Sequence, residues 1–315
     1  MPGAVGIICM MLATGEFLVG QFANGFIGLV NFMDWIKTGR LSLMDLILTA
    51  LAISRIILLV SFISAIIVFN FFFDLYASGK MRYLETFWNL SNHLSAWFGT
   101  CLSIFYFLKI SNFSHPVFLW LKWRVNQVVL RMICICFLIA LLVNLLLKEK
   151  MTEIYKIYAV PGNKTNETQK TQIIKCHHFF NLILYYMAGF VPFIFSLISC
   201  FLLVFSLWRH TRQMQGNVTS SKDSGTEVHK KIMKSMVSFL FLFLLHHVGI
   251  IMASMSYVLF ESLLPVMFSM IITAIYPMAH SIILIQMNNK LRQASLRILW
   301  QLKACPKGSG KVFVT

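Results

Sequence analysis

The chain has 315 residues, of which 58% are hydrophobic and only 12% are charged. Soluble domains do not carry so large an apolar fraction, so the composition indicates a protein with several membrane-spanning segments. The formal net charge of +16 does not indicate nucleic-acid binding, because the Lys and Arg residues lie in short segments between apolar runs rather than along one stripe.

Seven apolar segments follow one another along the chain, and each is long enough to cross a bilayer, which takes about 20 residues. They cover approximately residues 6–33, 46–68, 87–110, 128–147, 180–207, 232–258 and 264–287. Residues 148–179 form the longest connection, and residues 288–315 form a tail. The sequence therefore predicts an all-α membrane protein, a seven-transmembrane helix bundle that occupies residues 1–315 as a single domain.

The basic residues indicate how this bundle is oriented. Of the 27 Lys and Arg residues, seventeen lie on one side of the predicted spans and eight on the other. Because cytoplasmic loops carry the excess of positive charge, we expect a multi-pass protein of the plasma membrane with its N-terminus outside and its C-terminus in the cytoplasm. Two glycosylation sequons, at Asn163 and Asn166, fall in the connection 148–179. This orientation makes that connection a long outer loop, so we expect glycosylation there.

Arg55 lies in the middle of the second apolar segment, where a charge is costly and by default faces the bundle interior. At a rise of about 1.5 Å per residue, Asn24 in the first span and His280 and Ser281 in the seventh lie at a similar depth. We expect these four residues to form one central polar layer that satisfies the guanidinium. Two interpretations stay open: a buried network that fixes helix register, and a switch layer that rearranges between inactive and active states.

A second group of polar and aromatic side chains lies in the outer halves of the spans. On the third span they occupy positions that share one helix face, namely Trp88, Asn89, Asn92 and His93. The fifth, sixth and seventh spans add Tyr185, His246, Met267 and Met270 at a comparable depth. Such a convergence of aromatic, amide and thioether groups predicts an apolar cavity with a few directional polar groups, suited to bulky and mostly apolar ligands.

Three functional classes are disfavoured. A retinal protein needs a Lys in the last span for its Schiff base, and the sequence has none between Lys234 and Lys290. No histidine or carboxylate spacing suits a metal, so we expect no metal, no cofactor and no enzymatic activity. A transporter would be expected to show repeated halves or broken helices with midplane charges. A receptor with one outer pocket remains.

Three motifs carry a specific resemblance to a known family. The exit of the third span, from Leu102 to Pro116, reads LSIFYFLKISNFSHP. The second span contains LTALAISR, which ends at Arg55, and the seventh contains HSIILI, which begins at His280. These segments closely resemble the matching parts of the taste receptors type 2, the bitter taste receptors, and the resemblance covers the whole chain. Asn217-Val-Thr, residues 273–277 and the closing Val314-Thr315 are most similar to the member 10 branch of that family.

The resemblance implies a G protein-coupled receptor that binds bitter small molecules in the outer half of the bundle. It also implies signalling through a heterotrimeric G protein of the gustducin type to phospholipase C-β and calcium. The positions that match the pocket of the family are Trp88, Asn89, Asn92, His93, Leu182, His246 and Met267.

Basic residues at the expected cytoplasmic ends of the spans would face the G protein. They are Lys109, Lys122, Arg124, Arg209, His210, Arg212, Lys230 and Lys231. The simpler explanation of these charges is membrane topology and contact with lipid head groups. For the whole chain, a chemosensory receptor of the same fold for a non-taste cue and a small-solute transporter remain as alternative functions.

Overall fold

The computed structural model describes residues 4–71, 82–159, 189–209, 212, 224–259 and 263–304, which are almost entirely helical. Seven long helices lie within these ranges: α1 (Ala4–Thr38), α2 (Leu43–Phe71), α4 (Arg82–Ile110), α6 (Val125–Ala159), the helix Gly189–Arg209, α8 (Ser224–Leu259) and α9 (Leu263–Met287). Two shorter helices are α5 (Pro116–Trp123) and α10 (Asn289–Ala304). The described residues therefore form the all-α bundle that the sequence predicts.

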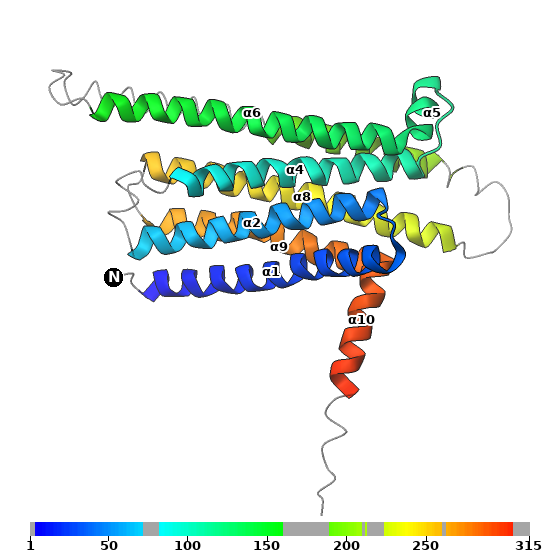
Figure 1. The fold of residues 1–315 in the computed structure, drawn as a ribbon, viewed down its shortest axis with the longest axis horizontal. Helices are drawn as coiled ribbons and strands as arrows, with labels where there is room; N and C mark the ends of the chain where they lie inside the picture. Colours follow the sequence, from blue (N-terminus) through cyan, green and yellow to red (C-terminus); the bar gives the residue numbers. More distant parts are fainter. Residues whose placement is uncertain are drawn as a thin grey trace, which may run out of the picture.

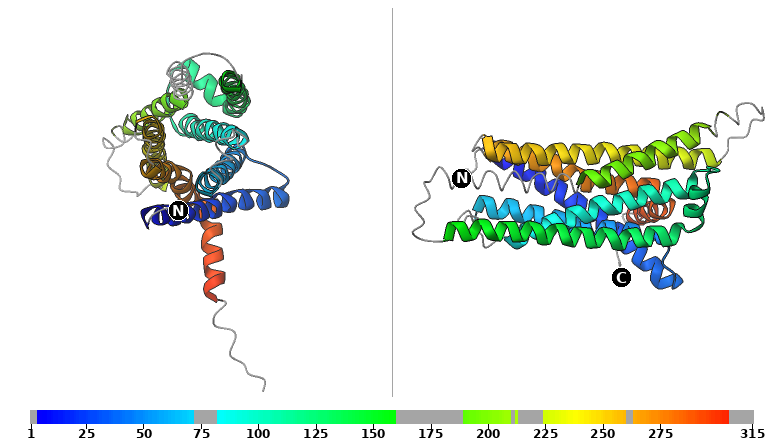
Figure 2. Two further views of the ribbon diagram at one scale, coloured as in Figure 1. Left: turned by 90° about the vertical axis from the view of Figure 1, so that its left-hand side faces the viewer. Right: turned by 90° about the horizontal axis from the view of Figure 1, so that it is seen from above.

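The long helices run side by side, and α5 and α10 lie at one end of the bundle (Figure 1). We call this end the α5 end, and we call the opposite end, where α1 begins, the N-terminal end. α1 packs against α2 and α9, α4 packs against α2 and α6, and α8 packs against α9. Viewed along the helices, α4 lies between α2 and α6 (Figure 2). The helix that carries more of the predicted ligand contacts than any other is thus held on two sides.

The helices contain every predicted span as far as its residues are described. Six are long and apolar enough to cross a membrane, in α1, α2, α6, Gly189–Arg209, α8 and α9. α4 is 29 residues long but does not reach the same hydropathy, because the polar side chains of the predicted site interrupt its apolar run. The points at which the chain enters the bilayer stay predictions.

Several helices extend beyond the predicted spans. α6 continues to Ala159, so the first part of the connection 148–179 is helical, while its remaining residues lie outside the described ranges. The sequence analysis also missed α5 and α10, although both have start signals. His115 Nδ1 accepts the Val117 N–H at 3.3 Å, and Pro116 follows as the first helical residue. Asn288 caps α10, since its Oδ1 accepts the backbone N–H groups of the second and third residues of that helix.

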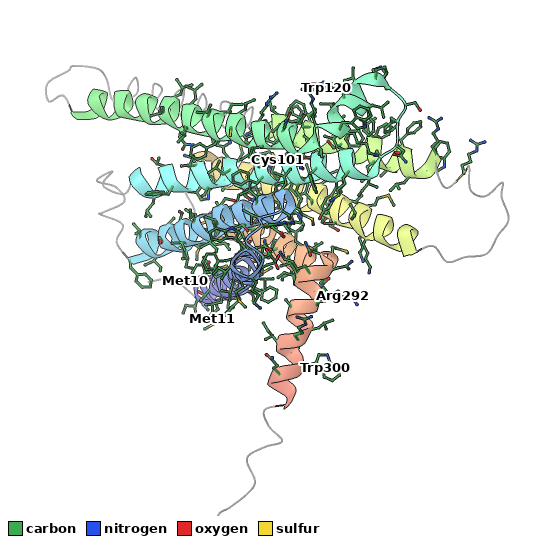
Figure 3. The ribbon with its side chains drawn as sticks, turned by 45° about the vertical axis from the view of Figure 1, so that its right-hand side comes forward. Met10, Met11, Cys101, Trp120, Arg292 and Trp300 are labelled. Atoms are coloured by element: carbon green, nitrogen blue, oxygen red, sulfur yellow. The ribbon has the colours of Figure 1, made fainter. Side chains whose placement is uncertain are left out.

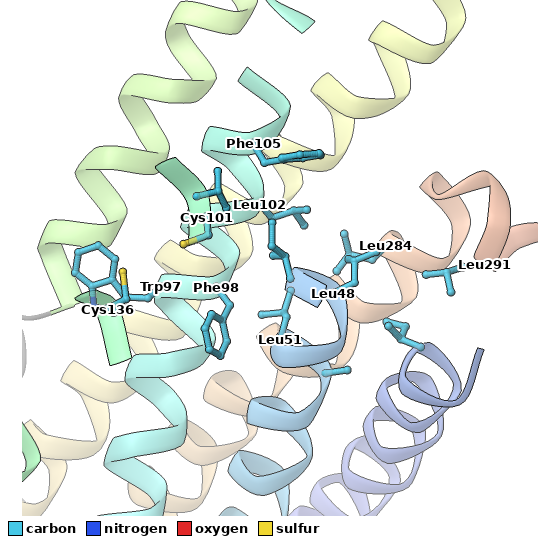
Figure 4. Packing of buried hydrophobic residues seen from close by; sticks show 14 residues of the cluster. Leu48, Leu51, Trp97, Phe98, Cys101, Leu102, Phe105, Cys136, Leu284 and Leu291 are labelled. Atoms are coloured by element: carbon cyan, nitrogen blue, oxygen red, sulfur yellow. The ribbon is translucent and has the colours of Figure 1, made fainter. Parts of the chain in front are cut away.

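The largest apolar cluster among the described residues joins α1, α2, α4, α6, α9 and α10 (Figure 4). Its labelled members are Leu48, Leu51, Trp97, Phe98, Cys101, Leu102, Phe105, Cys136, Leu284 and Leu291. The outside of the bundle is also apolar: the exposed fraction is 69% for Met11, 50% for Trp120 and 73% for Trp300 (Figure 3). Large apolar side chains on both the inside and the outside fit a bundle surrounded by lipid, whereas the polar residues lie inside it.

The contact between α8 and α9 depends on Gly249. A Cβ atom at this position would lie 3.0 Å from the backbone N of Thr273 and 3.1 Å from the carbonyl O of Ser269. Backbone atoms cannot rotate away as a side chain can. The two helices therefore approach each other through a position that requires glycine, as is common between membrane helices.

We predict that Gly249→Ala separates α8 from α9 and destabilises the protein by about 1–3 kcal/mol, the usual cost of inserting a methyl group into a packed contact. The apparent melting temperature of the purified receptor in detergent measures this loss. Gly25→Ala and Gly28→Ala on α1 are matched controls, because a Cβ at either position meets nothing within 4 Å. A melting temperature for Gly249→Ala that equals those of the controls would contradict the prediction.

Candidate functional site

Arg55 lies at the centre of a polar layer that joins α2, α4 and α9. Its side chain is fully buried. Nη1 donates to Ser281 Oγ at 2.9 Å, Nη2 donates to His280 Nδ1 at 2.6 Å, and Nε donates to Ser95 Oγ at 3.3 Å. A guanidinium can only donate, so His280 accepts at Nδ1 and carries its proton on Nε2.

Asn24 joins this layer through Ser281. The Ser281 hydroxyl lies 2.7 Å from Asn24 Oδ1 and 2.9 Å from the Pro277 carbonyl, and it donates to these oxygens while it accepts from Arg55. Asn24 Nδ2 donates to the carbonyl of Gly20 at 2.8 Å and to that of Pro277 at 3.3 Å. The structure thus brings the four residues of the predicted central layer together in one buried network.

Two members of the layer were missed from the sequence. Ser95 is three residues after Asn92 and therefore lies on the same face of α4. Tyr276 is four residues before His280 on α9, and the Cζ atom of Arg55 lies 4.9 Å from the centre of its ring. A cation held over an aromatic face is stabilised by the ring quadrupole, and the effect is larger when water is excluded. Both residues could have been found from the sequence, because each lies three or four positions from a residue of the predicted polar groups and therefore on the same helix face.

A second buried contact lies nearer the N-terminal end, where His246 of α8 connects α4 with α9. His246 Nδ1 lies 2.9 Å from the carbonyl of Thr273, and Nε2 lies 2.8 Å from the side-chain amide of Asn92. A carbonyl only accepts, so Nδ1 carries the proton. A neutral ring then accepts at Nε2. The Asn92 amide, whose Oδ1 is placed toward the ring, must therefore be flipped so that its NH2 group donates.

Pro277 explains why the Thr273 carbonyl is open to His246. In a regular helix this carbonyl would accept the N–H of the residue four positions later, but that residue is Pro277 within α9, which has no N–H. His246 supplies the missing donor from another helix. The polar groups are buried, with an exposed fraction of 1% for His246 and 6% for Asn92, so the hydrogen bond between them replaces contact with water.

The other predicted ligand contacts are distributed around this pair. His93 and Met267 are buried, whereas Trp88, Asn89 and Met270 are half-buried. Met270 packs against the cluster of Ala13, Phe62, Ile66 and Ala274. Leu182 and Tyr185 lie outside the described residues. Among the described residues of the predicted set, Asn92 and His246 are in direct contact. The other members lie on α4 (Trp88, Asn89 and His93) and on α9 (Met267 and Met270).

Several basic residues at the α5 end interact within the protein. Lys122 Nζ donates to the Ser111 carbonyl at 2.8 Å and to Asn112 Oδ1 at 2.7 Å, so it holds the connection between α4 and α5. The cations of Lys109, Arg124 and Arg212 lie over the rings of Phe105, Trp120 and Trp208, respectively. His210 lies outside the described residues. The sequence analysis predicts that Lys122 faces a G protein. In the structure its ammonium group instead makes hydrogen bonds within the protein.

Lys290 makes an ion pair that the sequence analysis did not single out. Its Nζ lies 2.8 Å from Asp34 Oδ2 and 2.8 Å from Asp45 Oδ1, and so ties α10 to α1 and α2. Burial lowers the pKa of the Lys290 ammonium, but the hydrogen bonds to the two carboxylates outweigh it and raise the pKa above its usual value. Because the folded-state pKa is raised, this stabilisation is complete at neutral pH and is lost only as the pH rises through the raised pKa.

Comparison with known proteins identifies the family. The model of the family described as taste receptor protein (TAS2R) matches residues 1–303. The chain belongs to this family. Taste receptor type 2 member 7 of Papio hamadryas is 43% identical over 309 residues, which cover 98% of both chains. Taste receptor type 2 member 8 of Homo sapiens is 44% identical over 293 residues, which cover 93% of this chain and 95% of the relative.

Membership in the TAS2R family makes the chain a multi-pass, seven-transmembrane G protein-coupled receptor for bitter compounds and not an enzyme. The alternative of a solute transporter is thereby excluded. The expected likeness to the member 10 branch is not supported, since the relatives found at this identity are members 7 and 8. That assignment relied on three short segments, which weigh less than identity along almost the whole chain.

We predict that Ser281→Ala destabilises this TAS2R receptor by about 1–3 kcal/mol, the cost of leaving buried polar partners unsatisfied, because both Arg55 and Asn24 lose a hydrogen bond. The apparent melting temperature in detergent is the measurement. Ser295→Ala is the control, since the Ser295 hydroxyl is exposed and donates to the Arg292 carbonyl of its own helix. Equal melting temperatures for the two variants would contradict a stabilising role of the layer.

Proposed function

We propose that bitter agonists bind near the N-terminal end of the bundle, against the contact between Asn92 and His246. This contact carries the proposal because it is a buried polar pair shared by three helices, and the aromatic ring of Tyr276 packs beside it. Such an arrangement is typical of small-molecule sites, where a few placed polar groups fix the orientation of a mostly apolar ligand. The other proposed contacts are Trp88, Asn89, His93, Leu182, Tyr185, Met267 and Met270.

A ligand that exchanges hydrogen bonds with Asn92 or His246 changes how α4 and α8 hold the Thr273 carbonyl of α9. It shifts the equilibrium between receptor states only by the difference in its affinity for them. In this proposal the layer around Arg55 is the element with two arrangements, because it fixes α2, α4 and α9 relative to one another. The same layer fixes helix register in each state, so its structural role and its switch role coexist.

At the α5 end, we propose coupling to a heterotrimeric G protein of the gustducin type, which acts through phospholipase C-β and calcium. Arg124 is exposed there, whereas Lys122 is partly engaged in local hydrogen bonds. The remaining proposed contacts are Lys109, Arg209, His210, Arg212, Lys230 and Lys231. The excess of positive charge at this end supports a cytoplasmic location for it and an N-terminus outside the plasma membrane.

Trp88→Ala and Asn92→Ala are each expected to raise the agonist concentration for half-maximal calcium response by about tenfold or more, which corresponds to about 1.4 kcal/mol of lost binding. Calcium imaging of cells with matched surface expression measures this shift. Ser103→Ala is the control on α4, because its hydroxyl donates to the Gly99 carbonyl nearer the α5 end. Undiminished responses of both variants to every agonist tested would contradict the proposed pocket.

We predict glycans at the sequons of Asn163 and Asn166. Glycosidase treatment should increase the electrophoretic mobility of the wild type but not that of the double variant Asn163→Gln/Asn166→Gln, because only the outer side meets the glycosylating enzyme. Asn217→Gln is the control, since the Asn217 sequon lies in the predicted cytoplasmic connection between the fifth and sixth spans. Loss of the glycan in Asn217→Gln, with no change in the double variant, would reverse the proposed orientation.

A further inference from the structure

α9 is a continuous helix that lacks one internal hydrogen bond, and this interruption of its bonding lies between the contact of Asn92 with His246 and the Arg55 layer. Pro277 removes the donor that Thr273 would use within the helix, and His246 of α8 replaces it. On the other side of the interruption, His280 and Ser281 are held by Arg55 of α2. The two halves of α9 are thus fixed by different helices, and a helix with a missing internal bond bends more easily at that point.

Tyr276 is the side chain that lies between these two layers. It is 1% exposed. The centre of its ring lies 5.2 Å from that of His246 and 6.1 Å from that of His280. The Arg55 guanidinium carbon lies 4.9 Å from the same ring. One aromatic ring therefore contacts the central residue of each layer.

The space around this ring is closely filled. A Cβ atom at Gly99 of α4 would lie 2.6 Å from Cε2 of Phe239 and 3.5 Å from the hydroxyl of Tyr276. Phe243 also packs on the ring, with the two ring centres 5.7 Å apart. In packing this dense, a side chain moves together with its neighbours rather than alone. A displacement of His246 is therefore passed to the Tyr276 ring and not absorbed by free space.

We propose that Tyr276 is the positioning residue that couples the ligand layer at Asn92 and His246 to the Arg55 layer. This inference rests on the proposed ligand site. When a ligand alters the position of His246, the hold on the Thr273 carbonyl and the packing on the Tyr276 ring change together. The ring then changes its position over Arg55, which shifts the balance of hydrogen bonds to His280 and Ser281.

The coupling uses the ring and not the hydroxyl. Within the described residues, the Tyr276 hydroxyl is buried and makes no hydrogen bond of good geometry, although it interacts electrostatically with the Arg55 guanidinium. The short contacts with His246, His280 and Arg55 described above are made by the aromatic ring. Phenylalanine preserves these contacts and removes a buried polar group that costs stability when unpaired. Leucine fills part of the volume but has no π-system to hold the guanidinium.

The test compares Tyr276→Phe with Tyr276→Leu in purified receptor, with agonist affinity and agonist-stimulated nucleotide exchange on the G protein measured separately per folded receptor. We expect Tyr276→Phe to keep agonist affinity and stimulated nucleotide exchange within about twofold of the wild type, since the ring contacts persist. We expect Tyr276→Leu to keep agonist affinity within about threefold but to lose about tenfold or more of the stimulated exchange, because binding and coupling are separate free energies. Tyr276→Met replaces the leucine variant if the latter does not yield folded receptor.

The outcomes separate this inference from the proposed ligand site. Normal stimulated exchange in Tyr276→Leu would overturn the coupling role, and so would a parallel loss of affinity and exchange, which indicates a structural role alone. A loss of exchange in Tyr276→Phe equal to that in Tyr276→Leu would show that the hydroxyl, and not the ring, matters. Asn92→Ala is measured in the same assay: if it keeps full agonist affinity, the ligand site is wrong whatever Tyr276 does.

Discussion

The structure depends on how the charge of Arg55 is accommodated within the bundle. A guanidinium removed from water is tolerated only when its donors are paired and its charge is stabilised. Here hydroxyls from α4 and α9, an imidazole from α9 and the face of Tyr276 surround it, and Asn24 of α1 closes the network through Ser281. Because each bond requires a particular depth and rotation, one side chain of α2 fixes the register of three other helices.

The same constraint explains the position of the polar groups nearer the N-terminal end. Pro277 leaves the Thr273 carbonyl without an internal donor, which would be costly in a buried helix. His246 satisfies it and is in turn satisfied by Asn92. A backbone defect in α9 therefore creates a contact between α4, α8 and α9 that a ligand can alter by offering other hydrogen bonds. No hydrogen bond described above joins this contact to the Arg55 layer, but the Tyr276 ring packs against both.

At the α5 end, charges are held in a different manner. Lys290 bridges Asp34 and Asp45, and Lys122 holds the connection that follows α4. These groups are partly exposed, so their contribution to stability is smaller than that of the buried layer and is reduced by salt. They nevertheless fix the short helices α5 and α10 relative to the bundle, and thereby shape the surface that we propose for the G protein.

Sequence alone determined the class of the protein, the approximate depth of its polar residues and the family resemblance. Apolar run length identifies membrane helices because the bilayer sets it, and a charge inside such a run identifies the interior face. The membership of Asn24, Arg55, His280 and Ser281 in one layer follows from depth along the helices. The starts of α5 and α10 were present in the sequence as caps, but were overlooked.

Only the tertiary structure decided which of these residues touch. The bond between Asn92 and His246 joins residues 154 positions apart, and that between Lys290 and Asp34 joins residues 256 positions apart. Depth along a helix does not specify rotation about its axis, and it is rotation that places Tyr276 over Arg55 and aims His246 at the carbonyl freed by Pro277. Rotation is set by the packing of all neighbouring helices at once, as at Gly249, and no single segment contains that information.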